Sequence, residues 1–183
     1  ALGFETVLSG GSTRRVYEKG QFTIPSDTAC YPAKLMHGHI MNLLEAGVDA
    51  IFYPCLTYNI DEKSSDNHYN CPVVAYYPEL LSGNIDGLSN GLFMYPYLNI
   101  NSRRVLVRGL RRCLSKRFGN IPKKEISRAV KFGFEQYNRY MEDIRREGER
   151  ALQFANKTGR RVMILAGRPY HIDSEICHGI NKL

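Results

Sequence analysis

Apolar residues recur at intervals of three and four in the first third of the chain, which is the spacing of one buried helix face. This repeat predicts a helix that begins at a cap residue, Ser26 or Asp27, and runs to about Ala46. Gly47 follows, and glycine readily adopts the left-handed conformation that ends many helices. The apolar positions that carry the pattern are Leu35, Met36, Ile40, Leu43 and Leu44.

Two further helices are predicted in the second half of the chain. Asn101 or Ser102 begins a basic amphipathic helix that extends to about Phe118, where a Gly-Asn pair ends it. Pro122 occupies the first position of the longest predicted helix. Its apolar residues keep a near-3.6 period for about 30 residues, with charged residues opposite. Thr158 and Gly159 close this helix.

Four short runs have the composition of strands. Residues 48–53 form a continuous apolar run closed by Pro54, as a strand buried on both faces does. The other runs are residues 72–76, 91–97 and 161–166. Because helix, glycine and buried strand follow one another as in half of a βαβ unit, we predict an α/β fold. It would be Rossmann-like, with a mainly parallel sheet and helices on both faces.

These elements predict three parts of the chain. Residues 1–100 are expected to form a cysteine-bearing α/β domain. Residues 101–160 form a basic helical segment, and residues 161–183 begin a second α/β half similar to the first.

Composition excludes several classes of protein. Hydrophobic residues make up 43% of the 183 residues and charged residues 23%, which is typical of a globular protein. No apolar run reaches the roughly 18–20 residues that span a bilayer, and no charged-then-apolar leader opens the chain. Five cysteines, an odd number spread widely, do not resemble a secreted disulfide framework. We therefore predict a cytoplasmic protein with no membrane partner.

Positive charge is concentrated in the second half of the chain. From Arg103 to Arg161 there are 18 Lys and Arg residues against six Asp and Glu, while the net charge of the whole chain is only +7. A basic region favours anionic partners. Few aromatic residues are interleaved in the pattern of single-strand binding proteins. We therefore predict a solvated helical face and no nucleic-acid partner.

Three cysteines lie in the stretch that we consider the functional centre, residues 24–74. Cys30, Cys55 and Cys71 are 25 and 16 residues apart, which is unlike zinc-finger spacing, and each lies close to a proline. Thiolates bind zinc, copper or iron–sulfur clusters, and buried cysteines also serve as small core residues. Because Cys30 begins a predicted helix and Cys55 ends a predicted strand, we expect the three thiols to converge on one cleft.

Other candidate site residues lie around this stretch and near the C-terminus. His37 and His39 are two apart on one predicted helix, so they face different directions. His68 and Asn67 lie in a polar loop of the kind that often binds ligands. Arg168 follows a predicted strand and can bind a carboxylate or phosphate. The GxGxxG and GxxxxGK motifs are absent, so no ATPase motif is present.

Four separated motifs resemble one known family. The runs IPSDTACYPAKLMHGHI, GVDAIFYPC, DNHYNCPVVAYYPE and LAGRPYHID resemble the uncharacterised domain of the CoA-substrate-specific enzyme activases. Those proteins are related to the activators and iron–sulfur components of 2-hydroxyacyl-CoA dehydratases and benzoyl-CoA reductases. The resemblance covers nearly the whole chain.

The resemblance implies a function in ATP-coupled, low-potential electron transfer to acyl-CoA-type chemistry. It implies an iron–sulfur cluster held by Cys30, Cys55 and Cys71, with Arg168 and Tyr170 lining the same cleft. The implied partners are the ATP-hydrolysing module of the same longer protein and an acyl-CoA-type substrate. Two alternatives remain open: a non-catalytic module that binds partners, and a zinc domain that uses cysteines with His37 or His68.

Overall fold

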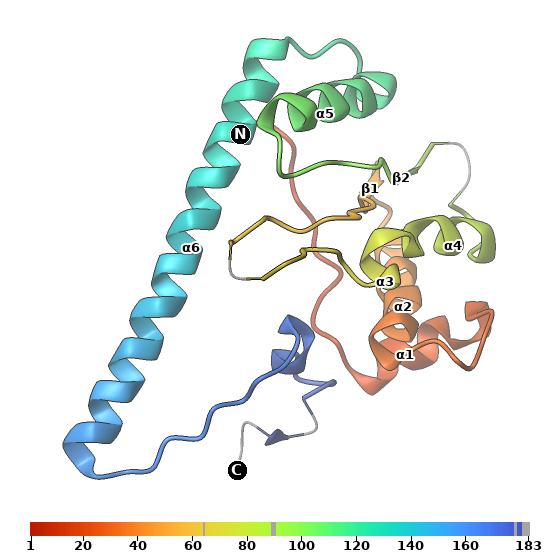
Figure 1. Cartoon of the computed structure of the whole chain (residues 1–183). Helices are drawn as coiled ribbons and strands as arrows, with labels where there is room; N and C mark the ends of the chain where they lie inside the picture. Colours follow the sequence, from red (N-terminus) through yellow and green to blue (C-terminus); the bar gives the residue numbers. More distant parts are fainter. Residues whose placement is uncertain (64, 89–90, 178, 181–183) are drawn as a thin grey trace.

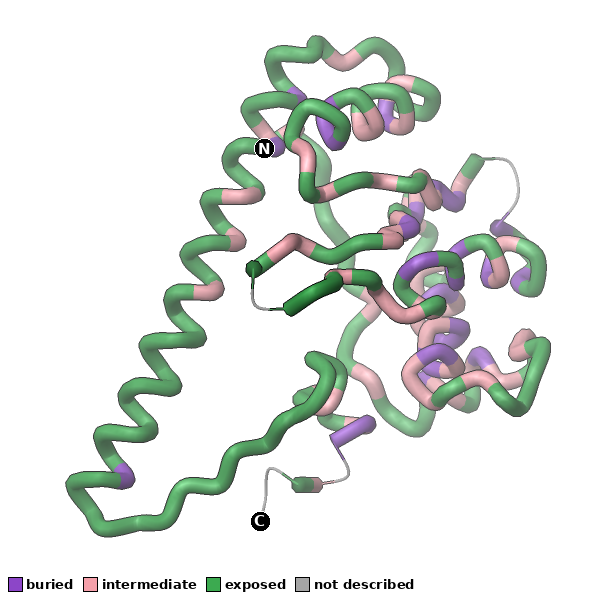
Figure 2. The backbone as a smooth tube through the Cα atoms, in the orientation of Figure 1, coloured by how far each residue is buried: buried purple, intermediate pink, exposed green. Residues whose placement is uncertain are grey.

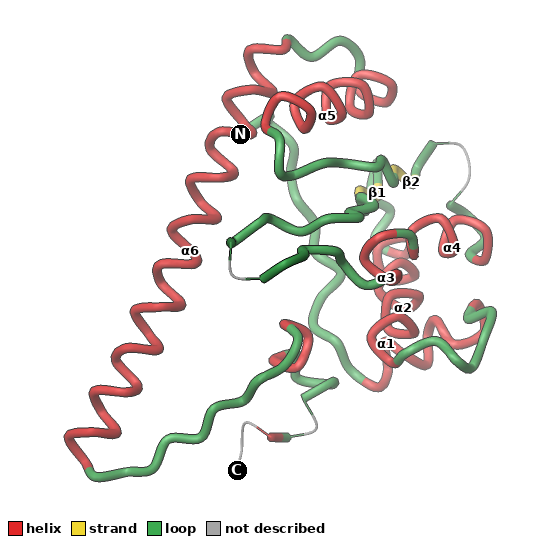
Figure 3. The backbone as a smooth tube through the Cα atoms, in the orientation of Figure 1, coloured by secondary structure: helices red, strands yellow, loops and turns green. Residues whose placement is uncertain are grey.

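The computed structural model describes residues 1–63, 65–88, 91–177 and 179–180, and it is mostly helical (Figures 1 and 3). Helices account for 53% of the described residues, and strands together with isolated β-bridge residues account for 5%. Three small hydrophobic cores organise the chain, one around α2 and the strands, one between α5 and α6, and one where the C-terminal segment meets α1.

Two helices near the N-terminus pack unusually closely. Helix α1 (Arg14–Gly20) starts at the capping side chain of Thr13, and the short helix η1 (Gln21–Thr23) continues it. Helix α2 (Tyr31–Glu45) begins after Cys30. A Cβ atom added at Gly38 would lie 1.7 Å from the carbonyl oxygen of Val16, so only glycine permits this contact.

The first core surrounds two very short parallel strands. Strand β1 (Ile51–Phe52) pairs in register with β2 (Phe93–Met94). Helices α3 (Pro72–Ala75) and α4 (Tyr77–Asn84) lie between them in sequence. The buried residues of this core come from α2, both strands, α4 and the residues that follow α4, and they are Ala33, Ile40, Ile51, Tyr77, Leu81, Ile85, Leu88 and Phe93.

Helices α5 (Arg103–Phe118) and α6 (Lys123–Thr158) form the second core. Leu106 and Val107 of α5 pack against Ile126 and Val130 in the first turns of α6. Beyond these turns α6 runs on as a long helix that is exposed on nearly all sides (Figure 2). Gly159 ends it in the left-handed conformation, with φ of 66°.

The chain then returns as an extended segment to the N-terminal helices (Figure 1). Residues 160–166 form no strand and are exposed. The short helix η2 (Pro169–Ile172) follows, and Ile176 packs against Val16 of α1 and Leu35 of α2. None of the helices in the described ranges has the length and apolar character that crossing a membrane requires.

The α/β prediction is wrong. The only sheet among the described residues has two strands of two residues each, so there is no mainly parallel Rossmann-like sheet. Residues 72–75 are helical, because Cys71 stands at the N-cap position and Pro72 occupies the first turn, where proline fits best. The predicted strand at residues 161–166 is not buried, since Met163 and Ile164 are 82% and 84% exposed.

The helix predictions succeed better. Helix α5 has the predicted bounds and is capped by Ser102. Helix α6 has the predicted length, although Pro122 lies at its N-cap rather than within it. Helix α2 starts later than predicted, at Tyr31. Helix α1 was not predicted, because its seven residues are too few to show a period.

His37 is a buried polar residue whose ring nitrogens both have partners. The hydroxyl of Thr23 donates to the carbonyl of Gly20 at 2.8 Å, so it accepts from Nδ1 of His37 at 2.7 Å. Nε2 therefore accepts from the hydroxyl of Tyr77 at 2.9 Å. Burial lowers the pKa of His37 from 6.5 to about 4. The folded structure thus stabilises the neutral imidazole.

This pKa shift makes stability depend on pH. Since the folded pKa lies below the unfolded one, the stabilisation is complete above pH 6.5 and is lost as the pH falls towards 4. We expect the free energy of unfolding to decrease by about 3 kcal/mol over this interval. Urea titrations of the protein and of His37→Gln measure it: the variant should be less stable at neutral pH and lose part of the pH slope. Equal slopes in the two proteins would contradict this assignment.

Candidate functional site

Hydrogen bonds join the two arms of the polar loop between Thr57 and Asn70. Its two arms pair through the N–H of Asn59, which donates to the carbonyl of His68 at 2.8 Å, and the N–H of Asn70, which donates to Thr57 at 2.9 Å. Across the same pair of arms, Tyr58 donates its hydroxyl to that of Tyr69 at 2.9 Å, with ring centroids 4.5 Å apart. The loop is therefore a short, irregular hairpin that presents His68 at a fixed place.

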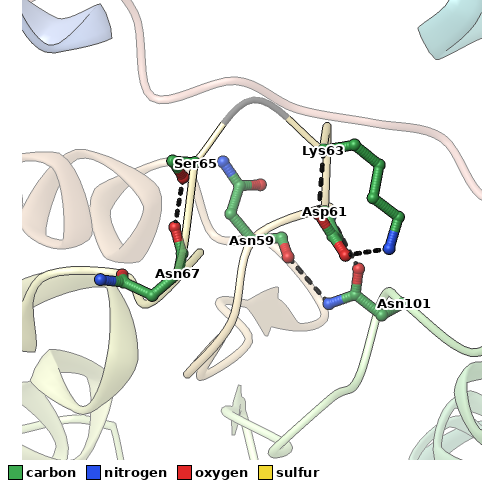
Figure 4. Close-up of polar contacts among 6 residues, drawn as sticks. All are labelled: Asn59, Asp61, Lys63, Ser65, Asn67 and Asn101. Atoms are coloured by element: carbon green, nitrogen blue, oxygen red, sulfur yellow. Dashed lines mark hydrogen bonds and ion pairs between the residues drawn. The ribbon is translucent and has the colours of Figure 1, made fainter.

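Asn101 fastens this loop to the segment that leads into α5 (Figure 4). Its Oδ1 accepts from the N–H of Asp61 at 2.9 Å, and its Nδ2 donates to the carbonyl of Asn59 at 2.8 Å. One amide side chain thus satisfies two backbone groups of the loop. Asn101 itself is exposed, so it makes these two bonds at the surface of the protein.

The loop tip carries a lysine and an aspartate in contact. Lys63 has φ of 59°, and its backbone N–H donates to Oδ1 of Asp61 at 2.9 Å. Its ammonium group lies 2.6 Å from Oδ2 of the same carboxylate. These hydrogen bonds from Lys63 lower the pKa of Asp61. Asn67 holds the descending arm, since its Oδ1 accepts from the N–H of Tyr69 at 3.3 Å.

A polar cleft of about 390 Å³ opens between this loop and the start of α5. Arg103, the first residue of α5, lies on one side with its guanidinium 5.1 Å from the ring centroid of Phe134. The first turn of α5 contains no acidic residue. The cleft is lined by Ile60, Asp61, Lys63, His68, Ile100, Asn101, Arg103 and Phe134.

An apolar groove of about 360 Å³ adjoins the polar cleft. The two share the lining residues Ile60, Ile100 and Phe134, so they lie side by side, and together we call them the composite cleft. The groove runs between α5 and α6, and its remaining lining residues are Leu2, Leu106, Leu110, Ile126, Ala129, Val130, Gly133 and Tyr137. One end of the composite cleft is charged and the other is almost wholly apolar.

The three candidate cysteines lie around a pair of tyrosines elsewhere in the fold. Tyr53 interacts electrostatically with the thiols of Cys55 and Cys71 and with Tyr77, and burial raises its pKa to about 12. Tyr77 in turn interacts with the thiol of Cys30. Cys30 is exposed, Cys71 is half-buried and Cys55 is buried.

Among the described residues, these three thiols do not form a metal-binding group. Burial and the nearby Glu79 raise the pKa of the Cys55 thiol, which opposes the thiolate form that a cluster needs. In the part of the chain that the structure describes, no group of three or more His, Cys, Asp or Glu side chains could hold a metal ion. The zinc alternative with His37 has no support either, since both ring nitrogens of His37 are in hydrogen bonds.

The other predicted site residues are divided between two regions. His68 lines the composite cleft, and Asn67 shapes the loop beside it. Arg168 is exposed at the start of η2, where its backbone N–H donates to the Nδ1 of His171 at 3.0 Å. Tyr170 stacks obliquely on His171, with ring centroids 4.7 Å apart. Neither Arg168 nor Tyr170 lines the composite cleft.

Sequence reasoning missed Lys63, Asn101, Arg103 and Phe134 as site residues. The signal for Phe134 was an apolar position on a periodic helix, which reads as core packing. Arg103 was one of many basic residues of its helix. Arg103 differs from the other basic residues of α5 only because the loop folds onto Asn101 beside it.

Fold and site define a mostly helical domain with a loop-walled cleft that is cationic at one end and apolar at the other. The chain belongs to the family described as the CoA enzyme activase uncharacterised domain, whose model matches residues 1–183, the whole chain. No curated protein and no solved structure matches it significantly.

We expect Asn101→Ala to loosen the loop, because two hydrogen bonds to its backbone are lost. The cost should be about 1 kcal/mol. Hydrogen exchange should accelerate at Asp61 and at neighbouring loop amides, with little change in α2. Asn84→Ala, which removes an exposed amide that bonds only within α4, is the matched control. Unchanged exchange at Asp61 would show that another contact positions the loop.

Proposed function

We propose that this activase-family domain binds an acyl-CoA-type ligand in the composite cleft. The observation that carries the proposal is that a charged end and an apolar end adjoin at Ile60, Ile100 and Phe134. An acyl-CoA has the same two-part character, with phosphates at one end and an acyl chain at the other. Ligand pockets are typically apolar with a few well-placed polar groups.

The charged end suits phosphate groups. Arg103 makes no ion pair with any described residue, so its guanidinium is available to a phosphate through paired N–H donors. Lys63 supplies a second cation, although Asp61 partly neutralises it. The N-terminus of α5 adds a favourable dipole beside Arg103. His68 adds a ring nitrogen on the loop side of the cleft.

The apolar end suits an acyl chain. Leu106, Ile126 and Val130 form its floor and are themselves buried, so the groove does not depend on the ligand to exist. Burying a methylene group contributes about 0.8 kcal/mol, so each carbon of the chain should strengthen binding by a few-fold.

Calorimetry with butyryl-CoA, free CoA and butyrate tests this proposal. Arg103→Ala should weaken binding of both CoA compounds about tenfold, because a charge-assisted hydrogen bond is lost. Phe134→Ala should weaken butyryl-CoA more than free CoA. Arg104→Ala is the matched control, since Arg104 is also exposed but lines neither end of the cleft.

Three outcomes would oppose the proposal. The first is that butyryl-CoA shows no binding at millimolar concentration. The second is that Arg104→Ala weakens binding as much as Arg103→Ala, which would indicate unspecific attraction to the basic helix. The third is that Phe134→Ala weakens free CoA and butyryl-CoA equally, which would show that the apolar groove is not part of the binding site. Far-UV circular dichroism of each variant shows whether folding is retained.

The iron–sulfur function is a separate proposal, in which Cys30, Cys55 and Cys71 would supply the thiolate ligands. Its support is the family resemblance together with the position of all three thiols around Tyr53 and Tyr77. Anaerobic reconstitution with iron and sulfide should give the visible absorption of a cluster, which Cys71→Ala abolishes and Cys113→Ala does not. No absorption in the unaltered chain would contradict it.

We propose that the partner of this domain is an ATP-hydrolysing activase module of the same longer protein, and the membership of the activase family supports this. The composite cleft would then hold the ligand while the partner supplies energy from ATP. A cytoplasmic location remains a prediction from the sequence.

A further inference from the structure

Four polar side chains, none of which lines the composite cleft, form a continuous hydrogen-bonded chain beside α1 and α2. The hydroxyl oxygen of Ser9 lies 2.9 Å from Nδ1 of His39. The hydroxyl oxygen of Ser12 lies 3.1 Å from Nε2 of the same ring and 2.6 Å from Oδ2 of Asp173. Three segments meet here: the residues before α1, helix α2, and the turn after η2.

Each proton in this chain has one consistent position. A serine hydroxyl has a single hydrogen, and that of Ser12 is donated to the carboxylate of Asp173. Ser12 must therefore accept from His39, so the neutral imidazole carries its hydrogen on Nε2. Nδ1 then has the free lone pair, and Ser9 donates its hydroxyl hydrogen to it. This is the relation between a nucleophilic serine and its general base.

The surrounding contacts hold each member in place. Oδ1 of Asp173 accepts the backbone N–H groups of Glu175 at 2.9 Å and Ile176 at 3.3 Å. Burial opposes ionisation of Asp173, but the hydrogen bonds from Ser12 and these N–H groups outweigh it and lower its pKa. The amide of Asn42 donates to the carbonyl of Ser9 at 3.0 Å. The base, its supporting carboxylate and the serine are thus positioned from three directions.

The approach to Ser9 is open. Ser9 is only half-buried, and Gly10 and Gly11 follow it. A Cβ atom added at either glycine would meet nothing within 4 Å, so a substrate can reach the backbone there. Neither glycine's N–H makes a hydrogen bond to any described residue, so both are available to an oxyanion.

We propose that Ser9 is the nucleophile of an acyl-transfer site for esters or thioesters, with His39 as general base and Asp173 supporting His39 through Ser12. The Oγ of Ser9 forms a bond to the substrate carbonyl carbon as its proton passes to Nδ1 of His39. The bond to the alkoxide or thiolate leaving group breaks, and His39 returns the proton to that group. Water then releases the carboxylic acid by the same steps. The site shares no residue with the composite cleft, so it stands or falls independently.

Reaction with a fluorophosphonate, a reagent for activated serines, tests this site in the full chain. Mass spectrometry should locate the label on Ser9, and Ser9→Ala should abolish it. His39→Gln should slow labelling about 100-fold, as loss of a general base does. Ser12→Ala and Asp173→Asn should each slow it less. Ser26→Ala is the matched control, because this exposed hydroxyl bonds only to Thr28.

The pH profile separates catalysis from a structural role. Labelling needs the neutral imidazole, so its rate should fall as the pH drops through the pKa of His39, and this step should be missing in His39→Gln. Ser9→Cys gives a second readout, since its alkylation by iodoacetamide should depend on His39 in the same way. Folding of every variant is checked by circular dichroism. Absence of label on Ser9, or equal labelling of folded His39→Gln, would overturn the proposal. The hydrogen bonds among these four side chains would then serve only to hold the three segments together.

Discussion

The contact between α1 and α2 at Gly38 is the constraint on which the N-terminal half depends. No side chain fits between the Val16 carbonyl and the backbone of α2, so the two helices approach as closely as backbones allow. The same approach brings the end of α1 close to His37 of α2, and it brings the residues just before α1 close to His39. His37 becomes a buried neutral ring, and His39 becomes a link in a chain that ends at Asp173.

The composite cleft has one wall that polar contacts anchor and one wall that an apolar core holds together. The loop wall of the composite cleft is fixed by an exposed amide, while the opposite wall is two helices joined by a small apolar core. The helical wall is held by its apolar core, whereas the loop wall is held by a few exposed hydrogen bonds. Because exposed hydrogen bonds open more easily than a packed core, we expect the width of the cleft to change by movement of the loop. This division is common where loops carry function on a scaffold of helices.

The sequence predicted what local periodicity determines. Helices α5 and α6 were predicted with nearly correct bounds because their apolar stripes repeat over many turns. The sheet was not predictable in the same way, since strand pairing depends on partners distant in the chain, and only two residues of each strand found one. His68 was predicted because polar loops often bind ligands, and it lines the composite cleft. Arg103 was not, because only the folded loop distinguishes it from six other basic residues of α5.

The exposed segment after α6 has a consequence for the behaviour of the chain. Val162, Met163, Ile164 and Leu165 form an apolar, extended and unpaired backbone, which is the kind of edge that recruits another copy by β-pairing. Arg160 and Arg161 precede this run and Arg168 follows it closely, so like charges would face one another in any parallel in-register stack. These arginines act as gatekeepers against self-association. Their protection is electrostatic, and it therefore weakens as ionic strength rises.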